Sequence, residues 1–315
     1  MLDLLRGRYR EAWPDFEWRW KLEHIPNPPA IDAPDWQGED LAGRHIAIHY
    51  ELHFGDVIQF ARYVPLLSER GARVTFVVPA KLIRQFRKLA TPNVALVSSI
   101  DPRSRFDFKC ALMSLPLRFG TEESSIPNHV PYLAAEADLT ARWKTKLGEH
   151  GFKIGVSWQG RPQRTVDRRA FALGDLTALS RLPGVRLISL QKNDGVNQLE
   201  AVPAGCNVET LGDFDNGPDA FIDTAAVMSN LDLVITSDTS IAHLAGALAR
   251  PTWLALKYVP DWRWLLDRND TPWYPTLRLF RQETIGDWTP VFSKMERELR
   301  SLATSAKTLR GARPR

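Results

Sequence analysis

Residues Leu231 to Leu256, LDLVITSDTSIAHLAGALARPTWLAL, contain the pattern that decides the fold. An apolar, β-branched run over 232–236 predicts a strand that is buried on both faces. Apolar and small residues at helical spacing follow over 241–249, and Pro251 ends that helix before a second apolar run over 252–256. The segment therefore predicts one strand–helix–strand unit of a parallel sheet.

A polar turn, Ser237-Asp238-Thr239-Ser240, joins the first strand to the helix. Residues of these types favour a helix N-terminus, whose first backbone N–H groups lack intrahelical partners and can bind a phosphate. His243 lies one turn into the helix, from where its side chain can reach the same ligand. The alternative is that Asp238 only caps the helix and that His243 is an interior residue with its own partner.

The rest of the chain repeats this alternation. Strands are predicted at 44–50, 72–79, 94–97, 106–110, 152–158, 185–191 and 208–211, and helices at 56–70, 80–89, 139–147, 176–181, 219–230 and 287–303. Strands that alternate with helices at this spacing indicate βαβ units. A chain of 315 residues is long enough for two such domains, so we expect two doubly wound α/β halves with a cleft between them.

Composition and charge limit the cellular compartment and the binding partners that can be expected for the protein. The formal net charge is +4, no apolar run has the length of a membrane span, and the first residues lack an apolar signal core. Cys110 and Cys206 suggest no disulfide framework, which predicts a cytoplasmic protein. The basic tail 307–315 predicts a solvated end with at most peripheral membrane contact. Aromatic residues are not interleaved with the basic residues of this tail, so nucleic-acid binding is not expected.

The first residues form an amphipathic helical pattern over 4–20. Gly7, Ala12 and Phe16 fall at the spacing of the second helix of a tetratricopeptide repeat, which the stretch resembles. Half a repeat cannot bury its own apolar face. Either it packs on the following domain or the chain begins inside a longer repeat array, through which it could bind a protein partner. A proline-rich connector, 26–34, follows.

The segment SDTSIAHLAGALARPTW resembles the D-[ST]-x-x-x-H-x-A-x-A/G-x-x-x-P signature of the heptosyltransferase-like glycosyltransferases of family 9, in the branch fused to tetratricopeptide repeats. The resemblance implies the GT-B fold, in which two Rossmann-like domains face a cleft and a nucleotide-sugar lies mainly on the second. The corresponding parts are a helical half-repeat with its connector (1–38), an acceptor-side domain (39–138), a nucleotide-sugar domain (139–286), and a helix that crosses back to the first domain with a basic tail (287–315).

In the first domain, HYELHFGDVIQFARY resembles the family stretch E-Q-G-x-G-D-x-I-Q-F-x-R-Y. The resemblance makes Asp56 the catalytic base and assigns Glu51, His53, Gly55 and Gln59 to the acceptor side or to its loop. The alternative is that Asp56 only caps a helix.

This stretch departs from the family pattern at two positions, where Leu52 and His53 replace the usual glutamine and glycine. The histidines at positions 45, 49 and 53 recur every fourth residue, but no complementary ligand set accompanies them, so no metal site is expected.

In the second domain, SWQGRPQRTVDRRAFAL and the S-L-Q-K element resemble family segments near the donor. The implied donor-binding residues are Arg169, Gln191, Lys192, Asp238, Thr239, Ser240 and His243, with Arg164 and Arg168 assisting. Residues 259–288 resemble the repeat-linked branch, and Asp261, Trp262 and Arg263 are expected either to close one side of the pocket or to pack.

These features together predict an inverting transferase that moves a sugar from a nucleoside-diphosphate-sugar to the hydroxyl of an unidentified acceptor, without a cofactor or metal. Two alternatives stay open. One is a nucleotide-sugar epimerase or hydrolase of the same architecture. The other is a degenerate, non-catalytic domain that serves as an interaction module.

Overall fold

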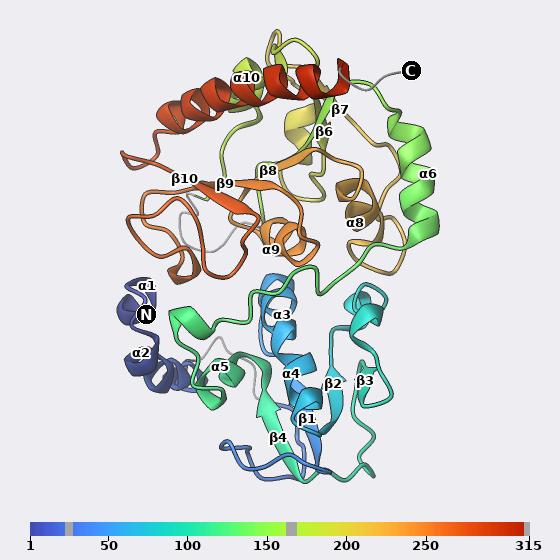
Figure 1. Ribbon diagram of the computed structural model, residues 1–315, viewed down its shortest axis with the longest axis vertical. Coiled ribbons are helices and arrows are strands. Elements are labelled where there is room, and N and C mark those ends of the chain that lie inside the picture. Colours follow the sequence, from blue (N-terminus) through green and yellow to red (C-terminus); the bar gives the residue numbers. More distant parts are fainter. Residues whose placement is uncertain (23–27, 162–168, 312–315) are drawn as a thin grey trace.

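The chain folds into two α/β lobes, each built on one parallel sheet (Figure 1). The computed structural model describes residues 1–22, 28–161 and 169–311, with side chains up to residue 302. The first lobe has a four-stranded sheet of order β3-β2-β1-β4. Its strands are β1 (His45–His49), β2 (Arg73–Val77), β3 (Val94–Val97) and β4 (Phe108–Ala111).

The second lobe has a six-stranded sheet of order β10-β9-β8-β5-β6-β7, all of whose pairs are parallel. Its strands are β5 (Phe152–Ser157), β6 (Val185–Ser189), β7 (Val208–Glu209), β8 (Leu233–Ser237), β9 (Thr252–Leu256) and β10 (Leu277–Arg281). The unit predicted from 231–256 is therefore present as β8, a helix and β9. Strand β10 was not predicted. It lies at the sheet edge, where Arg278 stays exposed and obscures the apolar pattern.

Helices flank both sheets. They are α1 (Leu2–Leu5), α2 (Tyr9–Phe16), α3 (Phe54–Phe60), α4 (Val64–Glu69), α5 (Leu115–Arg118), α6 (Ala137–Leu147), α7 (Thr177–Ser180), α8 (Ile222–Met228), α9 (Ser240–Ala247) and α10 (Thr289–Gly311). None of the helices in the described part of the chain is both long enough and apolar enough to span a membrane.

Two predicted helices differ from the structure. The helix expected over 56–70 is divided by a 3-10 turn, Ala61–Tyr63, because Pro65 occupies the first turn of α4 and cannot donate a backbone hydrogen bond. The helix expected over 80–89 is reduced to two 3-10 turns. There, tertiary contacts override the helical pattern, because the Arg84 side chain donates a hydrogen bond to Glu136 and the Gln85 side chain donates one to the Ala134 carbonyl.

The lobes share one continuous apolar core. The cluster of buried side chains extends from Phe60 in the first lobe to Trp264 and Trp273 in the second. At the same contact Arg62 of the first lobe donates to the Trp273 carbonyl (2.5 Å) and lies over the ring of Tyr274 (4.4 Å). The two sheets are thus joined by buried side chains as well as by the connecting chain.

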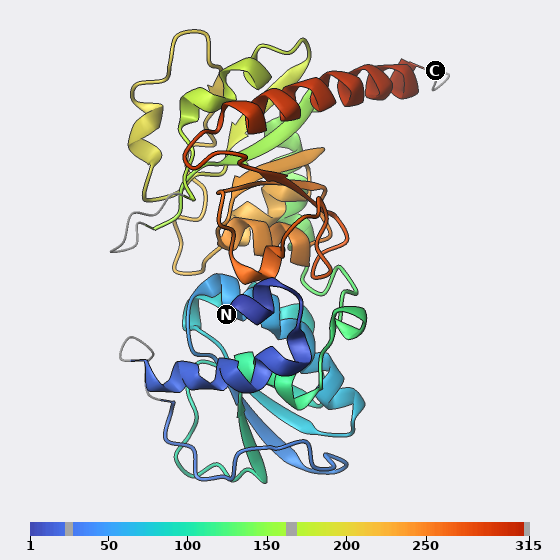
Figure 2. The same cartoon turned by 90° about the vertical axis from the view of Figure 1, so that its left-hand side faces the viewer.

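The N-terminal helices pack across this junction. Tyr9 lies edge-on to Trp273, with ring centroids 6.2 Å apart, and Trp13 lies edge-on to Trp262 at 5.6 Å. Figures 1 and 2 show α1 and α2 beside the first lobe, with α1 next to the part of the second lobe that precedes β10. The half-repeat packs on the following domain, as one of the two alternatives expected. The longer repeat array and the domain limits stay predictions.

The C-terminal helix corrects one expectation. Residues of α10 such as Phe292 and Met295 pack with Phe171 and Leu179 in a separate core on the second lobe. Figure 1 shows the helix at the end of the molecule away from the first lobe. The prediction that 287–315 forms a crossing helix was therefore wrong. Its amphipathic pattern required a buried face, and the second sheet supplies one.

Candidate functional site

The strand order places one candidate crevice in each lobe. In both sheets the order reverses beside the first strand, between β1 and β4 and between β5 and β8. In open parallel sheets, ligands bind outside the carboxyl ends of the strands at such a reversal. The loops after β1 and β4, and those after β5 and β8, are therefore the expected places for ligand contacts.

In the second lobe, the loop after β5 and the turn after β8 lie against each other. Thr239 is the N-cap of α9, and its hydroxyl accepts a hydrogen bond from the Ile241 N–H at 3.3 Å. A Cβ at Gly160 would lie 2.9 Å from the Thr239 methyl, so only glycine permits this approach. Arg169 donates to the Asp238 carbonyl at 3.3 Å. The structure therefore brings Arg169 to the turn at Asp238, Thr239 and Ser240. Arg164 and Arg168 lie outside the described residues.

The turn at the start of α9 holds a buried carboxyl. Asp238 is only 7% exposed, and its pKa is raised to about 6, chiefly by burial and then by the charge of Asp261. Arg169 and Arg263 act in the opposite direction, because each cation favours the carboxylate. Thr239, rather than Asp238, caps the helix, so the capping alternative for Asp238 does not describe this structure.

His243 is neutral and packed. Its Nδ1 lies 3.0 Å from the Tyr274 hydroxyl, and its ring stacks on Trp264 with centroids 5.5 Å apart. Burial, followed by the charges of Arg263 and Arg62, lowers the pKa of His243 well below its usual value. The interior alternative for this histidine therefore describes its surroundings, and donor binding by His243 stays a prediction.

Gln191 and Lys192 shape loops of the same lobe. The Gln191 Oε1 accepts from the N–H groups of Trp158 (2.9 Å) and Gln159 (3.1 Å), which fixes the loop after β5. Lys192 donates to the Phe214 carbonyl at 2.7 Å and to the Asn216 side chain. Both residues thus have protein partners, and direct contact with a donor stays a prediction.

Asp56 stands at the N-terminus of α3, where one of its oxygens has a structural role. The His53 N–H donates to Asp56 Oδ2 at 3.0 Å, so the carboxylate does cap the helix. Its other oxygen, Oδ1, forms an ion pair with Arg263 of the second lobe at 2.5 Å. The side chain is 14% exposed. Capping and catalysis are therefore not exclusive alternatives here, because the two oxygens have different partners.

The helix N-termini of the two lobes face each other at this point. A Cβ built on Gly55 would lie 3.0 Å from His243 Cδ2 and 3.6 Å from the Ser240 Cα. Glycine at position 55 thus lets α3 lie directly on α9. The candidate base and the candidate phosphate-binding turn are nearly 200 residues apart in the sequence, and the fold places them at one lobe contact.

Arg263, which was expected to close one side of the pocket or to pack, has partners at this contact that the sequence did not indicate. It is buried, and its guanidinium donates to Asp261 Oδ1 (2.9 Å), to Gln59 Oε1 and to Asp56 Oδ1. Burial lowers the pKa of Arg263, but the nearby Asp261 and Asp56 carboxylates outweigh that effect and raise it overall. An arginine between two tryptophans, W-R-W, was the available signal that a buried charge lies here.

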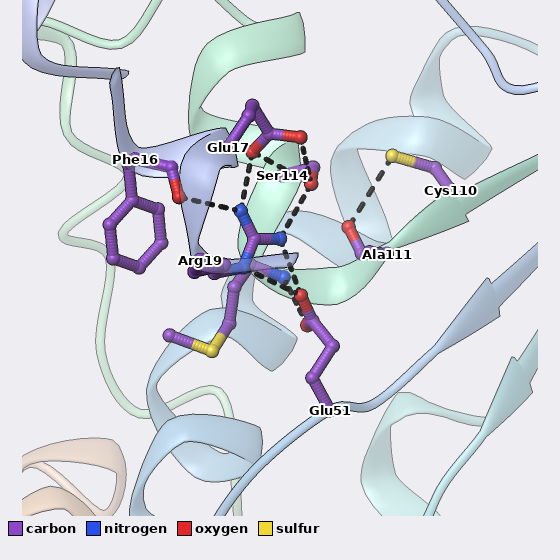
Figure 3. A network of polar contacts seen from close by, with 8 residues as sticks. Phe16, Glu17, Arg19, Glu51, Cys110, Ala111 and Ser114 are labelled. Atoms are coloured by element: carbon purple, nitrogen blue, oxygen red, sulfur yellow. Dashed lines mark hydrogen bonds and ion pairs between the residues drawn. The ribbon is translucent and has the colours of Figure 1, made fainter. Parts of the chain in front are cut away.

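Glu51, expected on the acceptor side or in its loop, lies in the loop after β1 and pairs with the N-terminal segment. Figure 3 shows it facing Arg19, which belongs to a 3-10 turn (Glu17–Lys21) of the N-terminal segment. Arg19 donates to Glu51 Oε1 at 2.5 Å, and the Met113 N–H donates to Oε2 at 2.9 Å. Burial raises the pKa of Glu51, against the lowering effect of Arg19.

With 1% of its side chain exposed, Glu51 ties the loops after β1 and β4 to the N-terminal segment. At the carboxyl ends of β1 and β4, the Arg19 side chain therefore contacts both loops, through Glu51 and Ser114. His53, in contrast, is exposed at the start of α3. Among the described residues, no group of three or more His, Cys, Asp or Glu side chains is arranged to hold a metal ion.

Comparison with known proteins agrees with this architecture. No protein-family model matches the chain. The chain is 26% identical to Protein FlbA of Caulobacter vibrioides over an alignment 326 positions long, which takes in 96% of this chain and 54% of FlbA. It thus spans about half the length of that relative.

Solved structures identify the fold. The Escherichia coli ADP-heptose lps heptosyltransferase II superposes with a TM-score of 0.58 at 13% identity, over 84% of this chain and 99% of that one. The fold is GT-B, as in the family 9 heptosyltransferases. The family 9 glycosyl transferase of Veillonella parvula (TM-score 0.54, 13% identity, 83% and 91% covered) and the Escherichia coli heptosyltransferase WaaC (0.52, 13%, 81% and 99%) are similar in the same way.

Proposed function

We propose that this protein is an inverting glycosyltransferase that uses a nucleoside-diphosphate-sugar donor and a hydroxyl acceptor. One observation carries the proposal. A carboxylate of the first lobe, Asp56, and the polar turn at the start of α9 in the second lobe stand at the same lobe contact. Transfer between two substrates needs a base on one side and an anion site on the other, at short range. The shared fold with heptosyltransferases supports this proposal.

The donor would bind on the second lobe. Its diphosphate would lie at the N-terminus of α9, attracted by the positive end of the helix dipole and by the Ser240 hydroxyl, and Arg169 would supply positive charge. The Ile241 and Ala242 N–H groups already bond to Thr239. Gln191 would act on the donor indirectly, by fixing the loop after β5.

The chemical step would be a single displacement. Asp56 accepts the proton of the acceptor hydroxyl while that oxygen forms a bond to the anomeric carbon. The bond from the anomeric carbon to the diphosphate oxygen breaks on the opposite face, and its electron pair leaves with the nucleoside diphosphate. Charge that develops on the leaving group would be stabilised by the positive end of the α9 dipole and by Arg169, since fixed dipoles and cations in a dry site supply much of such catalysis.

The first experiment is a ligand panel. ADP-, UDP-, GDP- and dTDP-sugars, with ADP-heptose included, are tested by thermal shift, because a ligand that binds the folded state raises the melting temperature. The matched variant is Arg169→Gln, which should reduce the shift of any nucleotide that binds. No stabilisation by any member would contradict the transferase proposal and favour the interaction module.

The second experiment separates transfer from other chemistry on the same donor. The nucleotide that binds is incubated alone and then with candidate hydroxyl acceptors, and release of nucleoside diphosphate is followed. Turnover that requires an acceptor and inverts the anomeric configuration agrees with the proposal. Rapid turnover of the donor alone would favour a hydrolase or epimerase. We also propose that transfer needs no metal, so EDTA should leave the rate unchanged.

A further inference from the structure

We propose that Arg263 is the positioning residue that sets the orientation of the Asp56 carboxylate, so that the donor lobe aligns the base carried by the acceptor lobe. This inference rests on the proposed function, in which Asp56 is the base. The observation behind it is the ion pair between Arg263 and Asp56 across the lobe contact.

The guanidinium of Arg263 is fixed in three directions. Its Nε–H donates to Gln59, one Nη–H to Asp261, and another Nη–H to Asp56. Asp56 and Gln59 are three residues apart on α3, so the planar group contacts one turn of that helix at two points. Asp261 accepts from both the backbone and the side chain of Arg263, which anchors the arginine to the second lobe.

Packing removes the remaining freedom of the arginine. Its guanidinium carbon lies 4.6 Å from the Trp262 ring centroid and 5.8 Å from that of Phe60, and its side chain is 9% exposed. A buried cation must keep its anionic partners, because loss of a partner leaves an uncompensated charge. Arg263 can therefore change position only if the lobe contact changes with it.

The consequence for Asp56 is geometric. The His53 N–H holds Oδ2 within the first lobe, and Arg263 holds Oδ1 from the second. The position of the carboxylate is thus defined relative to both lobes, including the α9 turn that would carry the donor. A base that is displaced by about 1 Å can lose on the order of 100-fold in rate.

The test uses Arg263→Lys, which keeps the positive charge but cannot donate in three fixed directions. We expect kcat to fall about 10- to 100-fold while the dissociation constant of the nucleotide stays within about twofold. The matched control is Arg62→Lys. Arg62 is a buried arginine at the same lobe contact, and its hydrogen bonds go to the carbonyls of Gln59, Pro127 and Trp273 and to Tyr132. This control should lower the melting temperature but keep kcat within about twofold of wild type, since Asp56 keeps its partner.

A double-mutant cycle separates positioning from general damage. In an Asp56→Asn background, Arg263→Lys should cause little further loss of kcat, because the group that it positions is already gone. Losses that multiply, or a control variant that is as slow as Arg263→Lys, would overturn the proposal. If Arg263→Lys does not fold, Gln59→Met removes one anchor of the guanidinium and should give a smaller fall of the same kind. An unchanged kcat in that variant would also count against positioning.

A crystal structure of Arg263→Lys gives a readout that does not need activity. The Asp56 carboxylate should turn away from its wild-type position relative to α9. An unmoved carboxylate overturns the inference whether or not transfer is found. A moved carboxylate in a protein that turns over no nucleotide-sugar supports the positioning contact and refutes only the proposed function.

Discussion

Asp238 should make the protein less stable as the pH rises from about 4 to about 6. Its carboxyl is buried at the start of α9, and its pKa lies at about 6 compared with a reference value of 3.8. Below pH 3.8 the Asp238 carboxyl is protonated in both the folded and the unfolded chain, so it adds no pH dependence to the free energy of unfolding. Between pH 4 and pH 6 the folded chain binds more protons than the unfolded chain, so the free energy of unfolding falls as the pH rises. Above about pH 7 the loss is complete.

The size of the effect follows from the shift. About two pKa units correspond to about 3 kcal/mol. The substitution Asp238→Asn removes the titration but keeps the shape of the side chain. The difference in unfolding free energy between Asp238→Asn and wild type should therefore increase by about 3 kcal/mol from pH 3.5 to pH 7.5.

The measurement is urea unfolding of both proteins across this pH range. An effect of the new amide on stability that does not depend on pH cancels. The quantity that is interpreted is how the difference in unfolding free energy between the two proteins changes with pH. Asp261 supplies the control, since its charge is the second cause of the Asp238 shift. In an Asp261→Asn background the same increase should be smaller and should occur at lower pH. A difference that is flat from pH 3.5 to 7.5 would refute the reasoning.

Three further predictions concern the first lobe. Asp56→Asn should reduce kcat about 10²–10⁴-fold with nucleotide affinity nearly unchanged, the usual effect of losing a general base, and wild-type turnover would reject that role. Gly55→Ala places a methyl 3.0 Å from His243 and should cost about 1–3 kcal/mol of unfolding free energy; an unaltered denaturation curve would mean that α3 and α9 do not approach so closely. Glu51→Gln removes the buried carboxylate partner of Arg19 but keeps its pair with Glu17, and it should cost about 3 kcal/mol, measured by urea unfolding, whereas a neutral effect would show that the buried pair is dispensable.

Local patterns predicted the local parts of this structure. The run from 231 to 256 determines its own strand, turn, helix and strand, because hydrophobic periodicity and turn residues act over a few positions. Strands β3 and β9 begin and end at the predicted residues. The position of α10 could not be obtained in this way, since an amphipathic pattern shows that a helix has a buried face but not which surface covers it.

Contacts between residues far apart in the chain could not be predicted from the sequence for the same reason. Asp56 and Arg263 are separated by 207 positions, and no local pattern specifies that they form an ion pair. Glu51 follows a strand in a polar-looking loop, yet it is buried by an arginine from a segment that was expected to belong to a repeat. The partners of Asp56 and Glu51 therefore could not be predicted from the sequence, whereas the roles assigned to the two residues stay predictions.

The shared apolar core has a consequence for the construction of chimaeric proteins. A chimaera of this fold would join the first lobe of one protein to the second lobe of another. In this chain such a junction would separate Phe60 from Trp273, and Arg62 from the Tyr274 ring. Tyr9, on the N-terminal helices, also packs on Trp273. A working exchange must therefore transfer the N-terminal helices and the segment 262–274 as one unit with the surface of α3 that they cover.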